Sequence, residues 1–134
     1  PLYSSAASDV YKRQVLQKLK ERNTRIALVG ASNDTSKFGN RIYRDLRTKG
    51  YQVIPINPKE NEIEGDKAYA SIDVMDSLPD IVNFVVPPKI AIKVALRAKD
   101  LGITHLWYQP GSESDELEEL LRESHGIKYL INAF

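Results

Sequence analysis

The residues of this sequence that are best suited to binding chemistry lie in a polar loop between a buried apolar run and a helix start. The apolar run at residues 26–29 is followed by the small residues 30–32, and Lys37 adds a positive charge where the helical pattern begins. Small residues let the backbone approach a ligand closely. A helix N-terminus attracts phosphate because its N–H groups are unpaired and its dipole is positive there. The pattern at residues 30–39 therefore predicts a phosphate-binding loop. The alternative for Lys37 is that it is an ordinary solvated lysine on the surface.

The loop does not have the spacing of a dinucleotide fingerprint. From Gly30 the sequence reads GASNDT, whereas the pattern G-x-G-x-x-G requires glycine at Ser32 and Thr35. The acid that would hold a ribose diol after the second strand is replaced by Asn57, and Lys59 follows two residues later. Lys59 fits a phosphorylated ribose better than a free one. The predicted ligand is therefore a nucleotide with an extra phosphate, either NADP or coenzyme A.

A second loop follows the apolar run that ends at Val86. Pro87 and Pro88 have no N–H groups, so this loop is poorly suited to an anion. One interpretation is that the loop forms an apolar wall against which a flat base or an alkyl arm packs. The other is that the two prolines only begin the next helix.

A third loop contains Gln109 and Gly111. Acids at residues 113, 115 and 116 already complement the dipole of the helix that follows, so we expect no phosphate there. One interpretation is that Gln109 and Gly111 contact an amide-bearing ligand. The alternative is that Pro110 and Gly111 only form a turn.

These loops must be positioned by strands and helices that alternate along the chain. The apolar spacing predicts strands at residues 25–29, 51–56, 81–86, 103–108 and 127–131. It predicts helices at 15–23, from 36–38 to the glycine cap at 50, at 88–101, and from Ser112 or Ser114 to about Leu121. Residues 57–79 are less regular, with a short third unit near 63–64 and 68–69 and a helical turn from Ser71 or Asp73. The alternation predicts a Rossmann-type, doubly wound α/β domain, with a mainly parallel sheet of five to six strands and helices on both faces.

Composition narrows the class of protein. The 134 residues suffice for one domain, and 19 basic against 18 acidic residues give no basic excess for nucleic acid. No apolar run is long enough to span a bilayer. The absence of cysteine excludes disulfides, cysteine–metal sites and thiol nucleophiles. Because no secretion signal is visible, we expect a cytoplasmic location.

Residues 1–14 resemble a translated cloning or sequencing linker and lack the apolar core of a signal peptide. We expect this segment to lie outside the fold, or to add one helical turn, and we place the domain at residues 15–134.

The sequence gives little support for catalysis. His105 lies inside a predicted strand, where a core or sheet-face role is expected rather than that of a base, and His125 lies at a helix end. There is no G-x-S-x-G motif, no metal-ligand cluster and no recognisable carboxylate pair. The sequence therefore favours a binding module over an enzyme.

Five short motifs follow one another in a familiar order. They are Gly30-Ala31-Ser32, Lys37 with Gly39, Gly50-Tyr51 with Pro55-Ile56-Asn57-Pro58, Val85-Val86-Pro87-Pro88, and Trp107-Tyr108-Gln109-Pro110-Gly111. In this order the chain, over about residues 15–133, resembles the small single-domain CoA-binding proteins, which are similar to the CoA-binding domain of the succinyl-CoA synthetase α subunit. The resemblance implies coenzyme A as the ligand. The site residues it implies are Gly30, Ala31, Ser32, Lys37, Gly39, Asn57, Pro58, Lys59, Val86, Pro87, Pro88, Gln109 and Gly111.

Two features depart from that family. Its members often end in Asn-Ala-Cys, whereas residues 132–134 read Asn-Ala-Phe, which suggests a clipped last strand. Its larger relatives carry a second domain with a phosphorylated histidine, for which this chain has no room.

Three functions therefore stay open at the level of sequence. The first is a CoA or acyl-CoA binding protein, such as a sensor or carrier, acting as a homodimer or with a protein partner. The second is an NADP-binding oxidoreductase-type domain, and the third is a subunit or fragment of an acyl-CoA synthetase.

Overall fold

The computed structural model describes residues 5–131 apart from 22 and 125, and for residues 5–9 it gives the backbone alone. The predictions made for His125 and for residues 132–134 lie outside the described residues.

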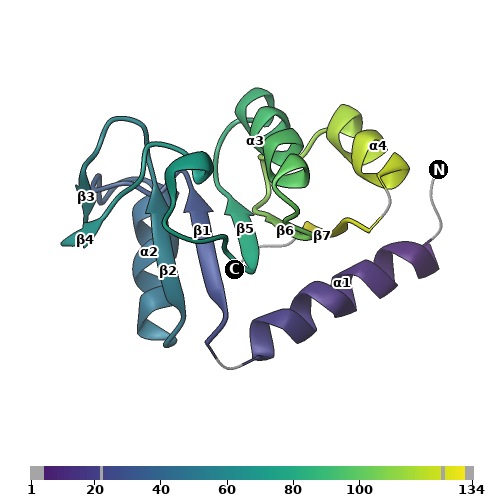
Figure 1. Ribbon diagram of the computed structural model, residues 1–134, viewed down its shortest axis with the longest axis horizontal. Coiled ribbons are helices and arrows are strands. Elements are labelled where there is room, and N and C mark those ends of the chain that lie inside the picture. The colour runs from purple at the N-terminus through teal and green to yellow at the C-terminus, as the bar shows by residue number, and fades with distance from the viewer. Residues whose placement is uncertain (1–4, 22, 125, 132–134) are drawn as a thin grey trace.

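Within the described residues, five parallel strands form the central sheet in the order β2-β1-β5-β6-β7 (Figure 1). Their bounds are β1 (Arg25–Val29), β2 (Gln52–Ile56), β5 (Ile81–Phe84), β6 (His105–Tyr108) and β7 (Lys128–Ile131). The chain runs from β1 outward to β2 and then returns to the other side of β1 as β5, so the strand order reverses between β1 and β5. This confirms the predicted doubly wound fold and places its topological switch point at the carboxyl ends of these two strands.

Helices cover both faces of the sheet, as predicted. They are α1 (Ser5–Lys20), α2 (Phe38–Thr48), α3 (Pro88–Asp100) and α4 (Asp115–Glu123). Alternate residues of a strand point to opposite faces, so Ile26 and Leu28 pack with α1 and α2, whereas Ala27 and Val29 pack with α3 and α4. Figure 1 shows α3 and α4 together on one side of the sheet and α1 across the other. None of the described helices is long and apolar enough to cross a membrane.

The first helix begins at Ser5 rather than Val15, so the prediction of at most one helical turn before residue 15 was wrong. The helix extends because Tyr11, Val15 and Leu19 recur every four residues and form one stripe. Val15 is fully buried, and the ring of Tyr11 packs on Tyr129 of β7 with 5.5 Å between centroids. The origin of residues 1–14 as a linker stays a prediction.

The irregular segment after β2 forms a small hairpin outside the main sheet. Its strands are β3 (Glu62–Ile63) and β4 (Asp66–Lys67), and the short helix η1 (Ile72–Val74) follows. Tyr69 returns to the main sheet only through an isolated parallel bridge to Ile56. The predicted third unit therefore exists, but it adds no strand to the sheet.

Candidate functional site

The loops after β1 and β5 touch at the switch point. Gly30 has a φ of +103°, a conformation that side chains rarely adopt. A Cβ on Gly30 would lie 2.6 Å from the carbonyl oxygen of Val85 and 2.8 Å from Cγ1 of Val86. Glycine is therefore required at this position both by backbone conformation and by space.

The start of α2 packs directly on the end of β1. Gly39 lies in the first turn of α2, and a Cβ there would come within 2.0 Å of the carbonyl oxygen of Gly30. Close packing of a helix on a strand is the role of the last glycine in a dinucleotide fingerprint. The structure thus gives Gly39 a packing role that the fingerprint spacing had missed, and its predicted contact with a ligand stays a prediction.

Two buried or half-buried amides hold the loop after β1. The side-chain amide of Asn40 donates to the carbonyl oxygen of Ser32 (2.9 Å), and that of Asn57 donates to the carbonyl oxygen of Ala31 (2.9 Å). The Oδ1 atom of Asn57 also accepts from the backbone N–H of Lys59 (2.8 Å). Asn57 was predicted as a ligand contact. In the structure it braces the loop after β1 from the end of β2, and its contact with a ligand stays a prediction.

The charge of the loop is mixed. Lys37 precedes the first residue of α2, is exposed, and makes no side-chain capping bond. The carboxylate of Asp34 accepts hydrogen bonds from the backbone N–H (2.9 Å) and hydroxyl (2.6 Å) of Ser36. These bonds, with a smaller contribution from the charge of Lys37, hold the pKa of Asp34 below its ordinary value. An ionised Asp34 offsets part of the positive charge that Lys37 brings to the loop.

A buried serine joins the loops after β5 and β6. The Ser112 hydroxyl donates to the carbonyl oxygen of Phe84 (3.2 Å) and accepts from the backbone N–H of Val86 (3.1 Å). Ser112 is only 2% exposed. The sequence gives no signal for this positioning role of Ser112 beyond a small polar residue after a turn.

Of the two serines predicted to cap α4, Ser114 is the cap, because its hydroxyl accepts from the N–H of Leu117 (3.1 Å).

Two cavities of about 350 Å³ each flank the end of β5. One, which we call the α3 cavity, lies against α3 and η1, and the other, the α2 cavity, lies against α2. The α3 cavity is lined by Val29, Gly30, Ile56, Asn57, Pro58, Ala70, Ser71, Ile72, Asp73, Val86, Ile90, Lys93, Val94 and Arg97. The α2 cavity is lined by Phe38, Arg41, Ile42, Asp45, Val85, Gln109 and Pro110. Since Val85 and Val86 are successive residues and each lines one cavity, the two cavities lie on either side of the loop after β5. We call the two cavities and this loop together the crevice.

Some of the predicted site residues line one of the two cavities, and the others line neither. Gly30, Asn57, Pro58 and Val86 line the α3 cavity, and Gln109 lines the α2 cavity. The other predicted residues lie outside both linings: Ala31, Ser32, Lys37, Gly39, Lys59, Pro87, Pro88 and Gly111. Pro88 instead lines a separate hollow between α3 and α4.

Sequence reasoning missed the cavity face of α3. Ile90, Lys93, Val94 and Arg97 recur every three or four residues and line the α3 cavity, beside the alanines at 91, 95 and 98 that face the core. This second stripe could have been found from its spacing.

The histidine among the described residues lines neither cavity. His105 lies at the amino end of β6, whereas the crevice lies at the carboxyl ends. Burial first, and then the charges of Lys128 and Lys18, hold the pKa of His105 below its ordinary value. Among the described residues no three His, Cys, Asp or Glu side chains are grouped so as to hold a metal ion.

One buried amide contacts a residue that lines the α2 cavity. Asn83, in the middle of β5, is fully buried, and its Oδ1 atom accepts from the side-chain amide of Gln109 (3.3 Å). The amide nitrogen of Asn83 has no partner among the described residues. Gln109 is thus positioned by a polar group inside the sheet, and it lines the α2 cavity.

The fold and this site define a Rossmann-type α/β domain with a crevice at the switch point of its sheet. Residues 24–133 match the family described as "CoA binding domain", and the chain belongs to that family.

Relatives of two kinds are found. The α subunit of ADP-forming acetate–CoA ligase II from Pyrococcus furiosus is 34% identical over 79 residues, which are 58% of this chain and 17% of that subunit. The uncharacterized protein YneT of Bacillus subtilis is 29% identical over 108 residues, which are 81% of this chain and 80% of that protein. A solved conserved hypothetical protein from Pyrococcus furiosus is 44% identical with a TM-score of 0.76, over 81% of this chain and 92% of that one. The chain thus spans only a small part of the ligase subunit and most of the two small proteins.

Proposed function

We propose that this protein binds coenzyme A or an acyl-CoA across the crevice at the switch point. The observation that carries the proposal is the position of the two cavities on either side of the loop after β5, one of them lined by Gly30, in a chain of the CoA-binding family. CoA has an adenine nucleotide at one end and a long amide-bearing arm at the other, with a pyrophosphate between them. Each cavity would then hold one end of the ligand.

The α3 cavity suits the adenine. Its walls include the apolar side chains of Ile56, Ile72 and Val86, which offer surfaces against which a flat base can pack. The ends of β1 and β2 border the same cavity through Gly30 and Asn57.

The loop at residues 30–32 and the start of α2 suit the pyrophosphate. Gly39 allows the N-terminus of α2 to pack closely on the end of β1, and in the proposal the positive end of this helix faces the pyrophosphate. Lys37 and Lys59, both exposed beside this loop, supply further positive charge in the proposal.

The α2 cavity suits the pantetheine arm. Phe38, Ile42 and Val85 provide apolar contacts, and Gln109 provides an amide that can exchange hydrogen bonds with the amides of the arm.

Ligand-dependent stabilisation tests the proposal. A ligand that binds only the folded chain raises the free energy of unfolding by about 2.7 kcal/mol at a hundredfold excess over Kd. Thermal unfolding should therefore be compared with CoA, acetyl-CoA, NADP and NAD. We expect CoA or acetyl-CoA to raise Tm more than NADP or NAD does. A shift with NADP and none with CoA would reject the proposal in favour of the oxidoreductase alternative, which neither the matched family nor its relatives support.

A role as a sensor or carrier, rather than as a complete enzyme, is part of this proposal, because we recognise no catalytic motif in the sequence. A cytoplasmic location is part of this proposal.

A second candidate is a subunit of an acyl-CoA synthetase, favoured by the similarity to an acetate–CoA ligase α subunit. In that case the histidine-bearing domain would be on another chain. Co-purification of such a chain from the native cells, or its gene beside this one, would favour the subunit over the independent binding protein.

A further inference from the structure

The α3 cavity contains a cation whose charge nothing in the cavity lining offsets. Three charged side chains line this cavity: Asp73, Lys93 and Arg97. Asp73 accepts a hydrogen bond from Nε of Arg97, so these two charges compensate each other. Among the described residues no hydrogen bond or ion pair engages Lys93, and its side chain is exposed. The cavity lining therefore has a net positive charge at Lys93.

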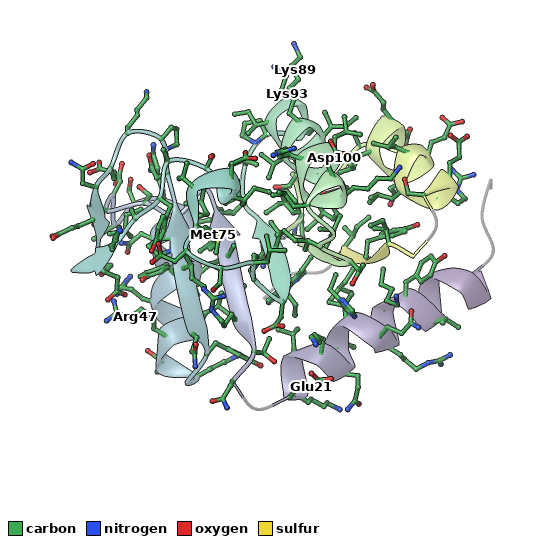
Figure 2. All side chains as sticks on the ribbon, viewed as in Figure 1. Glu21, Arg47, Met75, Lys89, Lys93 and Asp100 are labelled. Carbon is green, nitrogen blue, oxygen red and sulfur yellow. The ribbon has the colours of Figure 1, made fainter. Side chains whose placement is uncertain are left out.

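The position of Lys93 suits a group attached to the ribose. Ile90 and Val94, one on each side of it in the stripe of α3, also line the cavity proposed for the base. Because a ribose joins the base directly, a phosphate on that ribose would fall at the cavity rim, within reach of a long lysine side chain. Figure 2 shows Lys89 and Lys93 close together at the upper end of α3.

Other sources of positive charge are less well placed. Lys37 and Lys59 do not line the α3 cavity, and Lys37 shares its loop with the ionised Asp34. The N-terminus of α3 offers few donors, because Pro88 has no N–H group and the N–H group of Ile90 already donates to Pro87 (3.0 Å).

We infer that Lys93 binds the 3′-phosphate of CoA and so makes the protein prefer CoA to dephospho-CoA. The inference rests on the proposed function, in which the adenine occupies the α3 cavity. It assigns to α3 the phosphate recognition that the sequence had assigned to Lys59.

The test is calorimetric titration of the full chain with CoA and with dephospho-CoA, for the wild type and for Lys93→Ala. We expect the substitution to weaken CoA binding about tenfold, because a charge-assisted hydrogen bond is lost. The affinity for dephospho-CoA should change less than about twofold, since that ligand has no 3′-phosphate for Lys93 to bind. Lys93→Arg, which keeps the charge, should retain most of the preference for CoA.

Lys89→Ala is the matched control. Lys89 and Lys93 both border the hollow between α3 and α4, together with Glu116, but only Lys93 also lines the α3 cavity. It should leave the ratio of the two affinities unchanged. An unchanged ratio in Lys93→Ala, or a loss of the preference in Lys59→Ala alone, would overturn the inference while leaving CoA binding intact. A wild-type chain that binds neither ligand would overturn the proposed function together with the inference.

Discussion

Gly39 has no room for a side chain because its Cβ position lies 2.0 Å from the carbonyl oxygen of Gly30. This contact fixes the N-terminus of α2 against the end of β1 and sets the shape of the loop between them.

Gly39→Ala should therefore destabilise the fold even though alanine favours helices. Overpacking at this contact is expected to lower the free energy of unfolding by about 2–3 kcal/mol. Urea unfolding measures the change. Thr48→Ala, at an exposed position of the same helix, is the control and should stay within about 0.5 kcal/mol of the wild type. Equal stability of Gly39→Ala and the wild type would show that α2 does not rest on β1 in this way.

Ser112→Ala should affect both stability and binding. It leaves the N–H group of Val86 without its partner, at an expected cost of about 1–3 kcal/mol, and it frees the loop that separates the two cavities. Ser114→Ala, which removes the cap of α4, should cost about 1 kcal/mol but leave CoA affinity unchanged. Urea unfolding and CoA titration of both variants separate the two roles. Loss of CoA affinity in Ser114→Ala but not in Ser112→Ala would contradict the roles assigned to these two serines.

Gln109→Ala should show which half of the ligand Gln109 contacts. Removal of the amide from the α2 cavity is expected to weaken CoA binding by about 1 kcal/mol, or about fivefold. Adenosine 3′,5′-bisphosphate, which lacks the pantetheine arm, should bind the variant and the wild type equally well. Calorimetric titration with both ligands provides the comparison, and an equal loss for the two would place Gln109 elsewhere than at the arm.

Tyr11→Ala tests whether the N-terminal helix is part of the folded domain. The tilted packing of Tyr11 on Tyr129 predicts a loss of about 1–2 kcal/mol in the free energy of unfolding. Val10→Ala, at a neighbouring position that is 41% exposed, should have little effect. Denaturant unfolding of Tyr11→Ala that matches the wild type would support the view of residues 1–14 as a linker outside the fold.

His105 predicts a pH dependence of stability. Burial lowers its pKa in the folded chain below the ordinary value of 6.5, so the unfolded chain binds more protons as the pH falls below that value. Protonation therefore favours unfolding, and stability should fall as the pH decreases from 7 toward 5. Thermal unfolding of His105→Gln should show a weaker decline over this range. A steeper decline in the variant would contradict the assigned direction.

Local patterns in the sequence were sufficient to predict most of the fold. The apolar runs and the glycine that ends α2 indicated the strands and helices, since burial and capping act over a few residues. The helix before residue 15 was missed because the segment was set aside by its composition, although Tyr11 continues the stripe of Val15. The site was predicted less completely. The hydrogen bonds of Ser112 join residues far apart in the chain, so local patterns do not predict them. The second stripe of α3 can be recognised as a cavity wall only once the fold places β2 and η1 beside it.

A crystal structure of this chain with CoA bound would test the proposed binding mode most directly. We expect adenine in the α3 cavity against Val86, the pyrophosphate at residues 30–32, and the pantetheine arm leading past Gln109 into the α2 cavity. A CoA molecule whose base occupies the α2 cavity, or that lies away from the crevice, would contradict this binding mode.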